Sequence, residues 1–166
     1  MYGKPCWNVR AGYGSFLTFE FGKPHLEMRE PIVGKSSSRK ARELLARRPI
    51  FLHGDWHLWI YCCAWEIFSD GNHFADGSTR RGMEKAAEFL NGQKLMEVSL
   101  VPRKVLCTFK FDLGGTLKTI SYDRRSEQWL LYTPAHRVLI LRADRRYQYV
   151  HSDMPTDKGA WNPVFG

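Results

Sequence analysis

The chain has 166 residues and carries 25 lysines and arginines against 17 aspartates and glutamates, a formal net charge of +8. This length suits a single domain (residues 1–166) that buries a core without disulfides or metals, and the 14% aromatic content favours packed β structure over disorder. Apolar runs are too short to cross a bilayer, and the N-terminus lacks the pattern of a secretion signal, so we expect a cytoplasmic protein that does not bind membranes. Cys6, Cys62, Cys63 and Cys107 have no disulfide-framework spacing, which agrees with that compartment.

The first predicted elements are two short strands. Residues 15–21 alternate apolar and polar side chains, as in a strand with one buried face. Gly22–Pro24 then predicts a turn, and residues 25–29 a strand that returns beside the first. Pro31 ends it.

Residues 34–49 form a strongly basic insertion. Ser38 is placed to cap a short helix that Pro49 ends, and a mobile loop is the alternative. Glu43 is the one acidic residue against six basic ones: Lys35, Arg39, Lys40, Arg42, Arg47 and Arg48.

The most apolar stretch covers residues 50–68. Bulky side chains occupy both alternating sets in residues 56–63, which predicts a central strand covered on both faces. Residues 80–91 predict one amphipathic helix, because Met83, Ala86, Ala87 and Leu90 recur at helical spacing before an Asn-Gly stop.

Alternating strands dominate the remainder. Residues 94–101 predict a strand, and residues 105–122 predict a hairpin that turns at Gly114 and Gly115. Further strands are expected at 128–133, 138–142 and 147–150. The Pro- and Gly-rich tail, 152–166, contains Trp161, so we expect it to dock on the domain.

The chain also shows signs of an internal repeat. Residues 18–21 (TFEF) match 108–111 (TFKF), and residues 56–59 (WHLW) match 129–132 (WLLY). Two pseudo-repeated β halves, about 5–70 and 94–150, would follow, joined by the helix. The expected fold is therefore α+β: mostly antiparallel sheet, as a sandwich or half-open barrel, with one amphipathic helix.

The second half resembles small uncharacterised bacterial β-rich domains. Those domains share a G-Q-x-L start, an F-x-F-D-x-G-G hairpin and an E-x-W-x-L strand. The resemblance rests on residues 90–95 (LNGQKL), 109–115 (FKFDLGG), 127–134 (EQWLLYTP) and 138–144 (VLILRAD). It implies a fold and no particular reaction.

Residues 53–57 (HGDWH) are the candidate for metal chemistry. On one strand, His53, Asp55 and His57 would face the same way and could reach one ion. We favour the simpler interpretation, in which His53 and Asp55 belong to a turn entering the strand, and we predict neither a metal nor another cofactor. A nucleophilic Cys62 or Cys63 assisted by His57 is a weaker possibility, since small buried cysteines are commoner.

The basic insertion is the best functional candidate. Its cations would attract the phosphates of a nucleic acid or an acidic protein surface. Arg80, Arg81, Arg124 and Arg125 could add secondary contacts. We expect a non-catalytic module that binds a protein partner, in an immunity, adaptor or inhibitor role. The alternatives are nucleic-acid binding through residues 35–48 and a hydrolase or metal site at 53–57.

Overall fold

The computed structural model describes residues 1–33, 38–101, 106–154 and 159–164. All strand pairs in this part of the chain are antiparallel, and they form three sheets. The expected α+β fold, rich in antiparallel sheet, is confirmed. The sheets remain open, and the described residues contain two helices, the predicted amphipathic one and the short one that the sequence offered as an alternative to a loop after Ser38.

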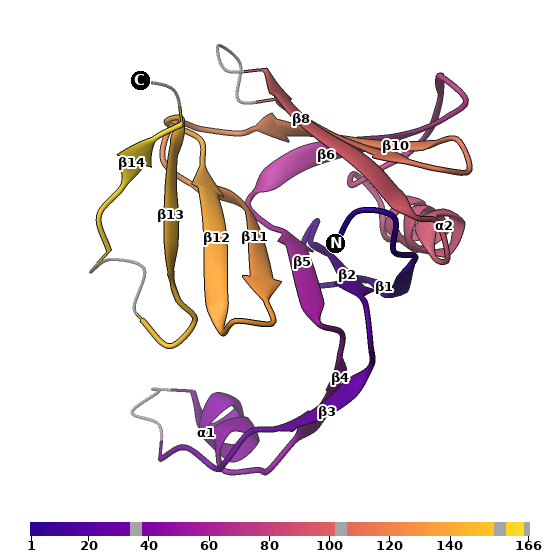
Figure 1. Ribbon diagram of the computed structural model, residues 1–166. Helices are drawn as coiled ribbons and strands as arrows, with labels where there is room; N and C mark the ends of the chain where they lie inside the picture. The colour runs from indigo at the N-terminus through magenta and orange to yellow at the C-terminus, as the bar shows by residue number, and fades with distance from the viewer. Residues whose placement is uncertain (34–37, 102–105, 155–158, 165–166) are drawn as a thin grey trace.

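The largest sheet has seven strands and curves across the molecule (Figure 1). In spatial order its strands are β1 (Cys6–Ala11), β2 (Leu17–Phe21), β5 (Trp56–Ile60), β11 (Glu127–Thr133), β12 (Arg137–Arg142), β13 (Arg146–His151) and β14 (Asn162–Pro163). The five-stranded sheet has the order β7 (Asn72–Asp76), β6 (Cys63–Ser69), β10 (Gly115–Ser121), β9 (Leu106–Phe111) and β8 (Leu95–Val101).

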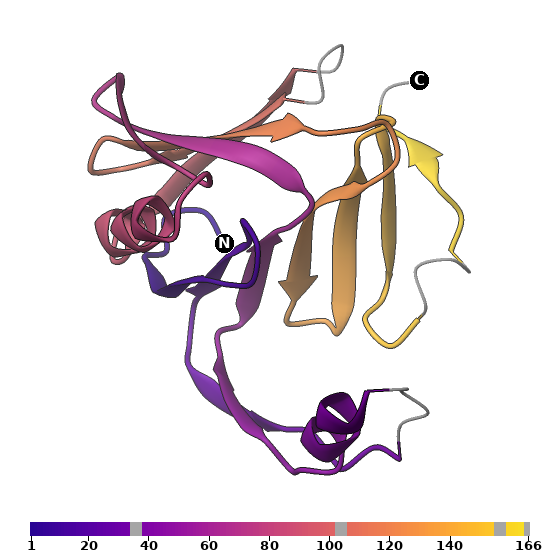
Figure 2. The same ribbon diagram turned by 180° about the vertical axis from the view of Figure 1, so that it is seen from behind.

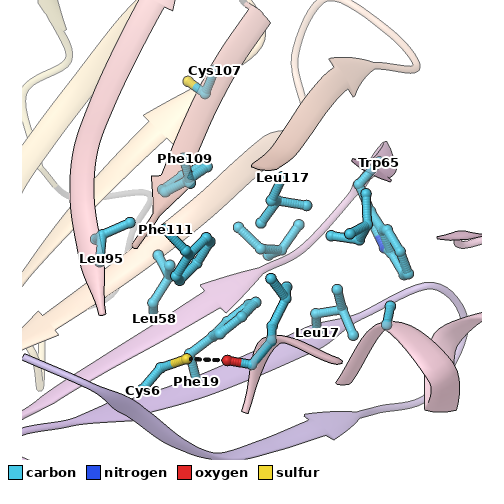
Figure 3. Close-up of a cluster of buried hydrophobic side chains, with 14 of the residues drawn as sticks. Cys6, Leu17, Phe19, Leu58, Trp65, Leu95, Cys107, Phe109, Phe111 and Leu117 are labelled. Carbon is cyan, nitrogen blue, oxygen red and sulfur yellow. Dashed lines mark hydrogen bonds between the residues drawn. The ribbon is translucent and has the colours of Figure 1, made fainter. Parts of the chain in front are cut away.

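The main core lies between these two sheets. Leu17, Phe19 and Phe21 from β2 are buried in one cluster with Phe109 and Phe111 from β9. Figure 3 shows Leu17, Phe19, Phe109 and Phe111 in this cluster. Apolar burial of this kind is the main favourable contribution to folding, roughly 1.5–3 kcal/mol for each large side chain. The alternation predicted for residues 15–21 and 106–111 therefore describes the two facing walls of the core.

Helix α2 (Arg80–Leu90) closes one end of the space between the sheets, where it packs against β1 and β7 (Figure 1). Its N-cap is Thr79, whose hydroxyl accepts from the Gly82 N–H at 3.0 Å. The predicted apolar stripe is confirmed, because the helix buries four side chains: Met83, Ala86, Ala87 and Leu90. At its far end the Cys6 thiol donates to the Leu90 carbonyl, the dashed line in Figure 3.

The opposite face of the seven-stranded sheet carries a second, smaller apolar cluster. Leu130, Val138 and Ile140 form its buried centre, and the surrounding side chains include Trp59 and Trp161. The predicted double-sided burial of residues 56–63 holds for β5, which is central between β2 and β11. Trp161 brings the tail onto this face, and β14 pairs with β13.

The prediction of one strand over residues 56–63 was wrong, because β5 ends at Ile60 and the next strand begins at Cys63. Residues 50–68 divide among β4 (Ile50–His53), β5 and β6, and these strands belong to three different sheets. Gly54 and Asp55 make the first break. At the second, the Cys63 N–H donates to the Tyr61 carbonyl at 2.8 Å, and the chain passes from one sheet to the other. Strand β7, which pairs with β6, was also missed.

The predicted internal repeat finds no support in the strand pairings. The segments matched to each other pair differently: β9 pairs with β10 in a hairpin, whereas β2 pairs with β1 and β5. Likewise β11 pairs with β5 and β12, whereas β5 pairs with β2 and β11. The shared letters reflect two half-buried strands that line one core.

Candidate functional site: a projecting arm and the cluster at its base

Residues 23–33 and 38–53 leave the body of the protein as an arm (Figures 1 and 2). The arm contains β3 (His25–Met28), helix α1 (Arg39–Leu45) and β4. The sequence predicted that residues 25–29 return beside residues 15–21, and this is wrong, because β3 pairs with β4 instead. Strands β2 and β5 pair up to Phe21 and Trp56, and the ribbon then continues outward as β3 and β4.

The bend at the base of the arm has an identifiable cause. Gly22 adopts a positive φ of 83°, which glycine tolerates best, and the following Lys23 N–H donates to Asp55 Oδ2 at 2.8 Å. On the other strand, a Cβ on Gly54 would lie 2.4 Å from the Phe21 carbonyl oxygen. The two backbone segments therefore cross so closely here that position 54 has no room for a side chain.

The β3–β4 ribbon exposes an apolar face. Leu26 pairs with Leu52 and Met28 with Ile50, so these four side chains lie on one side of the ribbon. All four are exposed, Leu26 by 71% and Ile50 by 63%. A two-stranded ribbon gains little stability alone, and large exposed apolar patches mark interaction sites in soluble proteins.

Further exposed apolar side chains lie elsewhere on the arm. Among the described residues, 17 large hydrophobic side chains are exposed, and eight of them lie on the arm. Besides the four on the ribbon these are Ile32, Val33, Leu44 and Phe51. Helix α1 buries none of its residues. Nearly half of the exposed large hydrophobic side chains of the described residues therefore lie on this one projection.

The basic insertion lies within this arm. The sequence from 23 to 53 has eight lysines and arginines and three glutamates. Arg39 pairs with Glu43 at 2.8 Å and Arg48 with Glu30 at 2.8 Å, all on exposed side chains. Arg42, Lys40 and Arg47 are also exposed, whereas Lys35 lies outside the described residues. Ser38 caps α1, so the helix alternative for residues 39–45 holds.

The predicted secondary contacts lie elsewhere. Arg80 and Arg81 are at the start of α2, far from α1 in both views (Figures 1 and 2). The Arg80 guanidinium donates to Glu84 at 2.8 Å and to the carbonyls of Ala11 and Gly12, so it ties α2 to the end of β1. Arg124 and Arg125 are exposed in the loop between β10 and β11.

A buried carboxylate joins the arm to the body. Glu20 points away from the main core, and its side chain is only 4% exposed. Its Oε1 lies 2.7 Å from His57 Nδ1 and 2.9 Å from His53 Nδ1, and its Oε2 accepts from the Gly54 N–H at 2.8 Å. The two imidazoles are close to each other, with ring centroids 5.2 Å apart. One side chain on β2 thus contacts the last residue of β4, the bend and β5.

Opposing effects act on the Glu20 carboxyl. Burial alone would raise its pKa. The opposing interactions outweigh burial: they are the hydrogen bond and charge of His57, the hydrogen bond from the Gly54 N–H and the hydrogen bond of His53. The resulting pKa lies below the ordinary value of 4.5. At neutral pH this group is therefore an ionised acceptor held between two imidazoles.

The structure brings together two of the three candidate metal ligands in residues 53–57 (HGDWH). His53 and His57 meet at Glu20, although they lie on different strands rather than at alternate positions of one strand. Asp55 does not join them, because its carboxylate accepts from Lys23 at the bend. Sequence reasoning missed Glu20, whose position in an alternating strand is typical of a solvent-facing residue.

The cysteines lack the features of nucleophiles. Burial raises the pKa of Cys63 to about 12 and also raises that of Cys62. The Cys63 thiol donates to the Gln128 carbonyl at 3.3 Å. A thiolate is the reactive form, so both cysteines would be poor nucleophiles at neutral pH.

Comparison with protein-family models, with curated proteins and with solved structures found no significant match. Among the described residues, no helix is long and apolar enough to cross a membrane. The protein therefore consists of two open antiparallel sheets and a basic arm, whose two-stranded ribbon exposes an apolar face.

Proposed function

We propose that this protein is a non-catalytic binding module whose arm docks on a protein partner. The observation that carries the proposal is the exposed apolar face of Leu26, Met28, Ile50 and Leu52 on a projection with net positive charge. Burying apolar surface supplies affinity, and surrounding cations select and steer the partner. The partner should present an apolar patch bordered by acidic side chains.

The charge of the arm argues against a second copy of this chain as the partner. In a twofold dimer the same surface meets itself. Two arms in apolar contact would bring the seven described basic residues on each side against only three glutamates. Like charges brought together at an interface cost free energy, so a partner of opposite charge fits better.

Nucleic acid is the second candidate, since Arg39, Lys40, Arg42, Arg47 and Arg48 are exposed on the arm. Phosphate contacts would use these cations and leave the apolar face uncovered, which is why we place a protein partner first. A salt series separates the two candidates. Binding of a generic duplex and a single strand should be weak at moderate salt, and serine at those five positions should change it little.

Site-specific photocrosslinking in the source cells tests the docking surface. A photoreactive residue replaces Leu26, and the control replaces Leu113, which has the same side chain, 70% exposed, in the β9–β10 hairpin. We expect one defined protein adduct from position 26 and none from position 113. The adduct should disappear when Leu52 is changed to Ser and weaken when Arg47 and Arg48 are changed to Ser.

Three results would overturn the proposal. Equal adducts from both positions would mean that position 26 is not a specific contact. An adduct that contains only a second copy of this chain would replace the acidic partner with a homodimer. Tight, salt-dependent binding of duplex or single-stranded nucleic acid that is lost in the five-serine variant would favour the nucleic-acid alternative.

A further inference from the structure

Three potential metal ligands converge where the arm meets the body. Glu20, His53 and His57 each offer one ligand atom, and these atoms all lie within 4.8 Å of one another. We propose that these three side chains bind a divalent transition-metal ion, and that Zn²⁺ is the ion they suit best. This site is independent of the docking surface proposed for the arm.

The chemistry of the ligands selects the class of metal. Two imidazole nitrogens and one carboxylate oxygen form a set that Zn²⁺ uses in sites with three protein ligands and one open position. Ca²⁺ and Mg²⁺ prefer shells made of oxygen atoms, and a set with two nitrogens does not suit them. The Glu20 carboxylate, ionised at neutral pH, supplies negative charge that offsets part of the ion's charge.

The carboxylate is already oriented for this role. The Gly54 N–H holds Oε2 at 2.8 Å, and Oε1 is thereby directed at both imidazoles. A hydrogen bond that fixes a ligating carboxylate is a regular feature of metal sites. The backbone at the bend thus supplies the outer support, and the three side chains supply the inner ligands.

A small adjustment admits the ion. Ligand atoms bound tetrahedrally at about 2.0–2.1 Å from Zn²⁺ are separated by roughly 3.3 Å. The two N–O separations are now 2.7 and 2.9 Å, so each must widen by about half an ångström. In the metal-bound state each imidazole would carry its proton on Nε2, which leaves the Nδ1 lone pair for the ion.

The site is accessible from one side. The His53 and His57 side chains are 27% and 19% exposed, which leaves a path for the ion and for a water molecule in the open position. The Tyr132 ring lies 5.8 Å from that of His57, and the Phe51 ring lies 5.9 Å from that of His53. His25, opposite His53 in the ribbon, is exposed and lies outside the cluster.

Titration calorimetry of the full chain with Zn²⁺ alone tests the proposal. We expect one ion per chain, and at least about tenfold weaker binding for His57→Ala and for His53→Ala. The control is His73→Ala, which removes an exposed imidazole on β7 that lies 3.7 Å from Asp76. Its affinity should equal that of the unchanged protein.

Co²⁺ provides a readout of ligand geometry. A tetrahedral site with nitrogen and oxygen ligands should give visible absorption bands that Zn²⁺ abolishes and that His57→Ala lacks. Glu20→Gln should weaken binding as the histidine changes do. If that variant folds poorly, His53→Ala still decides the case, because the His53 side chain is more exposed than that of Glu20. Stoichiometric binding that survives both histidine changes, or no binding at micromolar Zn²⁺, would overturn the proposal.

Discussion

Phe19 in β2 and Phe111 in β9 stack across the main core, with ring centroids 6.3 Å apart and ring planes inclined by 21°. Each belongs to one of the two similar tetrapeptides, TFEF and TFKF. The similarity arises because both strands present phenylalanine to the same interior from opposite sheets. This contact joins segments about 90 residues apart in the chain, so it contributes directly to holding the two sheets together.

A double-mutant cycle should detect this contact. Phe19 is fully buried and Phe111 nearly so, and we expect Phe19→Ala to lower the free energy of unfolding by about 3–5 kcal/mol. The double variant should lose less than the sum of the single changes, with a coupling of about 0.5–1.5 kcal/mol. Urea unfolding followed by tryptophan fluorescence measures all four proteins.

The control cycle pairs Phe19→Ala with Phe68→Ala. Phe68 lies on β6 and is only partly buried, and its ring contacts are to His73 and Lys118. These two changes should be additive within about 0.5 kcal/mol. Equal coupling in both cycles would mean that the stacked geometry of Phe19 and Phe111 has no specific effect.

Local patterns predicted the local elements well. The Gly114–Gly115 hairpin forms as expected, with Thr116 paired with Lys110, and the four apolar residues of α2 are the ones it buries. Pairing between distant segments was less predictable. The alternation through residues 56–68 continues across Tyr61 and Cys62, where neither glycine nor proline marks the change of sheet.

The candidate site was predicted in part. The density of cations at residues 35–48 indicated an exposed segment, but alternation could not tell that β3 pairs with β4 and exposes Leu26 and Leu52. His53 and His57 were recognised as a pair. Glu20 could not be added, because its burial depends on a contact with residues more than 30 positions away, brought close by the bend at Gly54.

Replacement of Glu20 should make stability less sensitive to acid. Because the pKa of this carboxyl is lower in the folded protein than its ordinary value of 4.5, it adds stability above pH 4.5, and this is lost as pH falls through the folded pKa. We expect Glu20→Gln to cost about 1–3 kcal/mol at pH 7, and the difference from the unchanged protein to shrink by pH 3.

Glu27→Gln is the matched control for the acid experiment, since Glu27 lies exposed on β3 of the arm. It should change the free energy of unfolding by less than about 0.5 kcal/mol at either pH. Urea titrations at the two pH values supply the comparison. A Glu20→Gln penalty that stays constant from pH 7 to pH 3 would contradict the expected contribution of the ionised carboxylate.

Cys62 should be the first thiol to react in the folded protein. Cys6, Cys63 and Cys107 are buried, and burial raises the pKa of Cys6 and of Cys63 to about 12. Cys62 is partly exposed. Iodoacetamide labelling at pH 8 followed by peptide mass analysis should find the label at Cys62 before any other position.

One variant and one denaturant control complete the thiol experiment. Cys62→Ser should abolish the early labelling. In denaturant all four cysteines of the sequence should react together, because unfolding removes the burial that protects Cys6, Cys63 and Cys107. Early labelling at Cys107 would show that the core opens near Trp129, whose indole N–H donates to the Cys107 sulfur at 3.1 Å.

Gly54→Ala should destabilise the protein and loosen the base of the arm. The added Cβ would lie 2.4 Å from the Phe21 carbonyl oxygen and 2.9 Å from the Phe21 nitrogen, so the backbone of one strand must shift. We expect a loss of about 1–3 kcal/mol, the usual cost of overpacking. The shift also displaces the Gly54 N–H from Glu20, so amide hydrogen exchange of β3 and β4 should quicken more than that of β9 and β10.

Gly71→Asn is the control, because position 71 has a φ of 83° that asparagine tolerates and no atom within 4 Å of the added Cβ. A similar loss at both glycines, or faster exchange spread evenly over the chain, would show that the close crossing at Gly54 does not hold the arm in place.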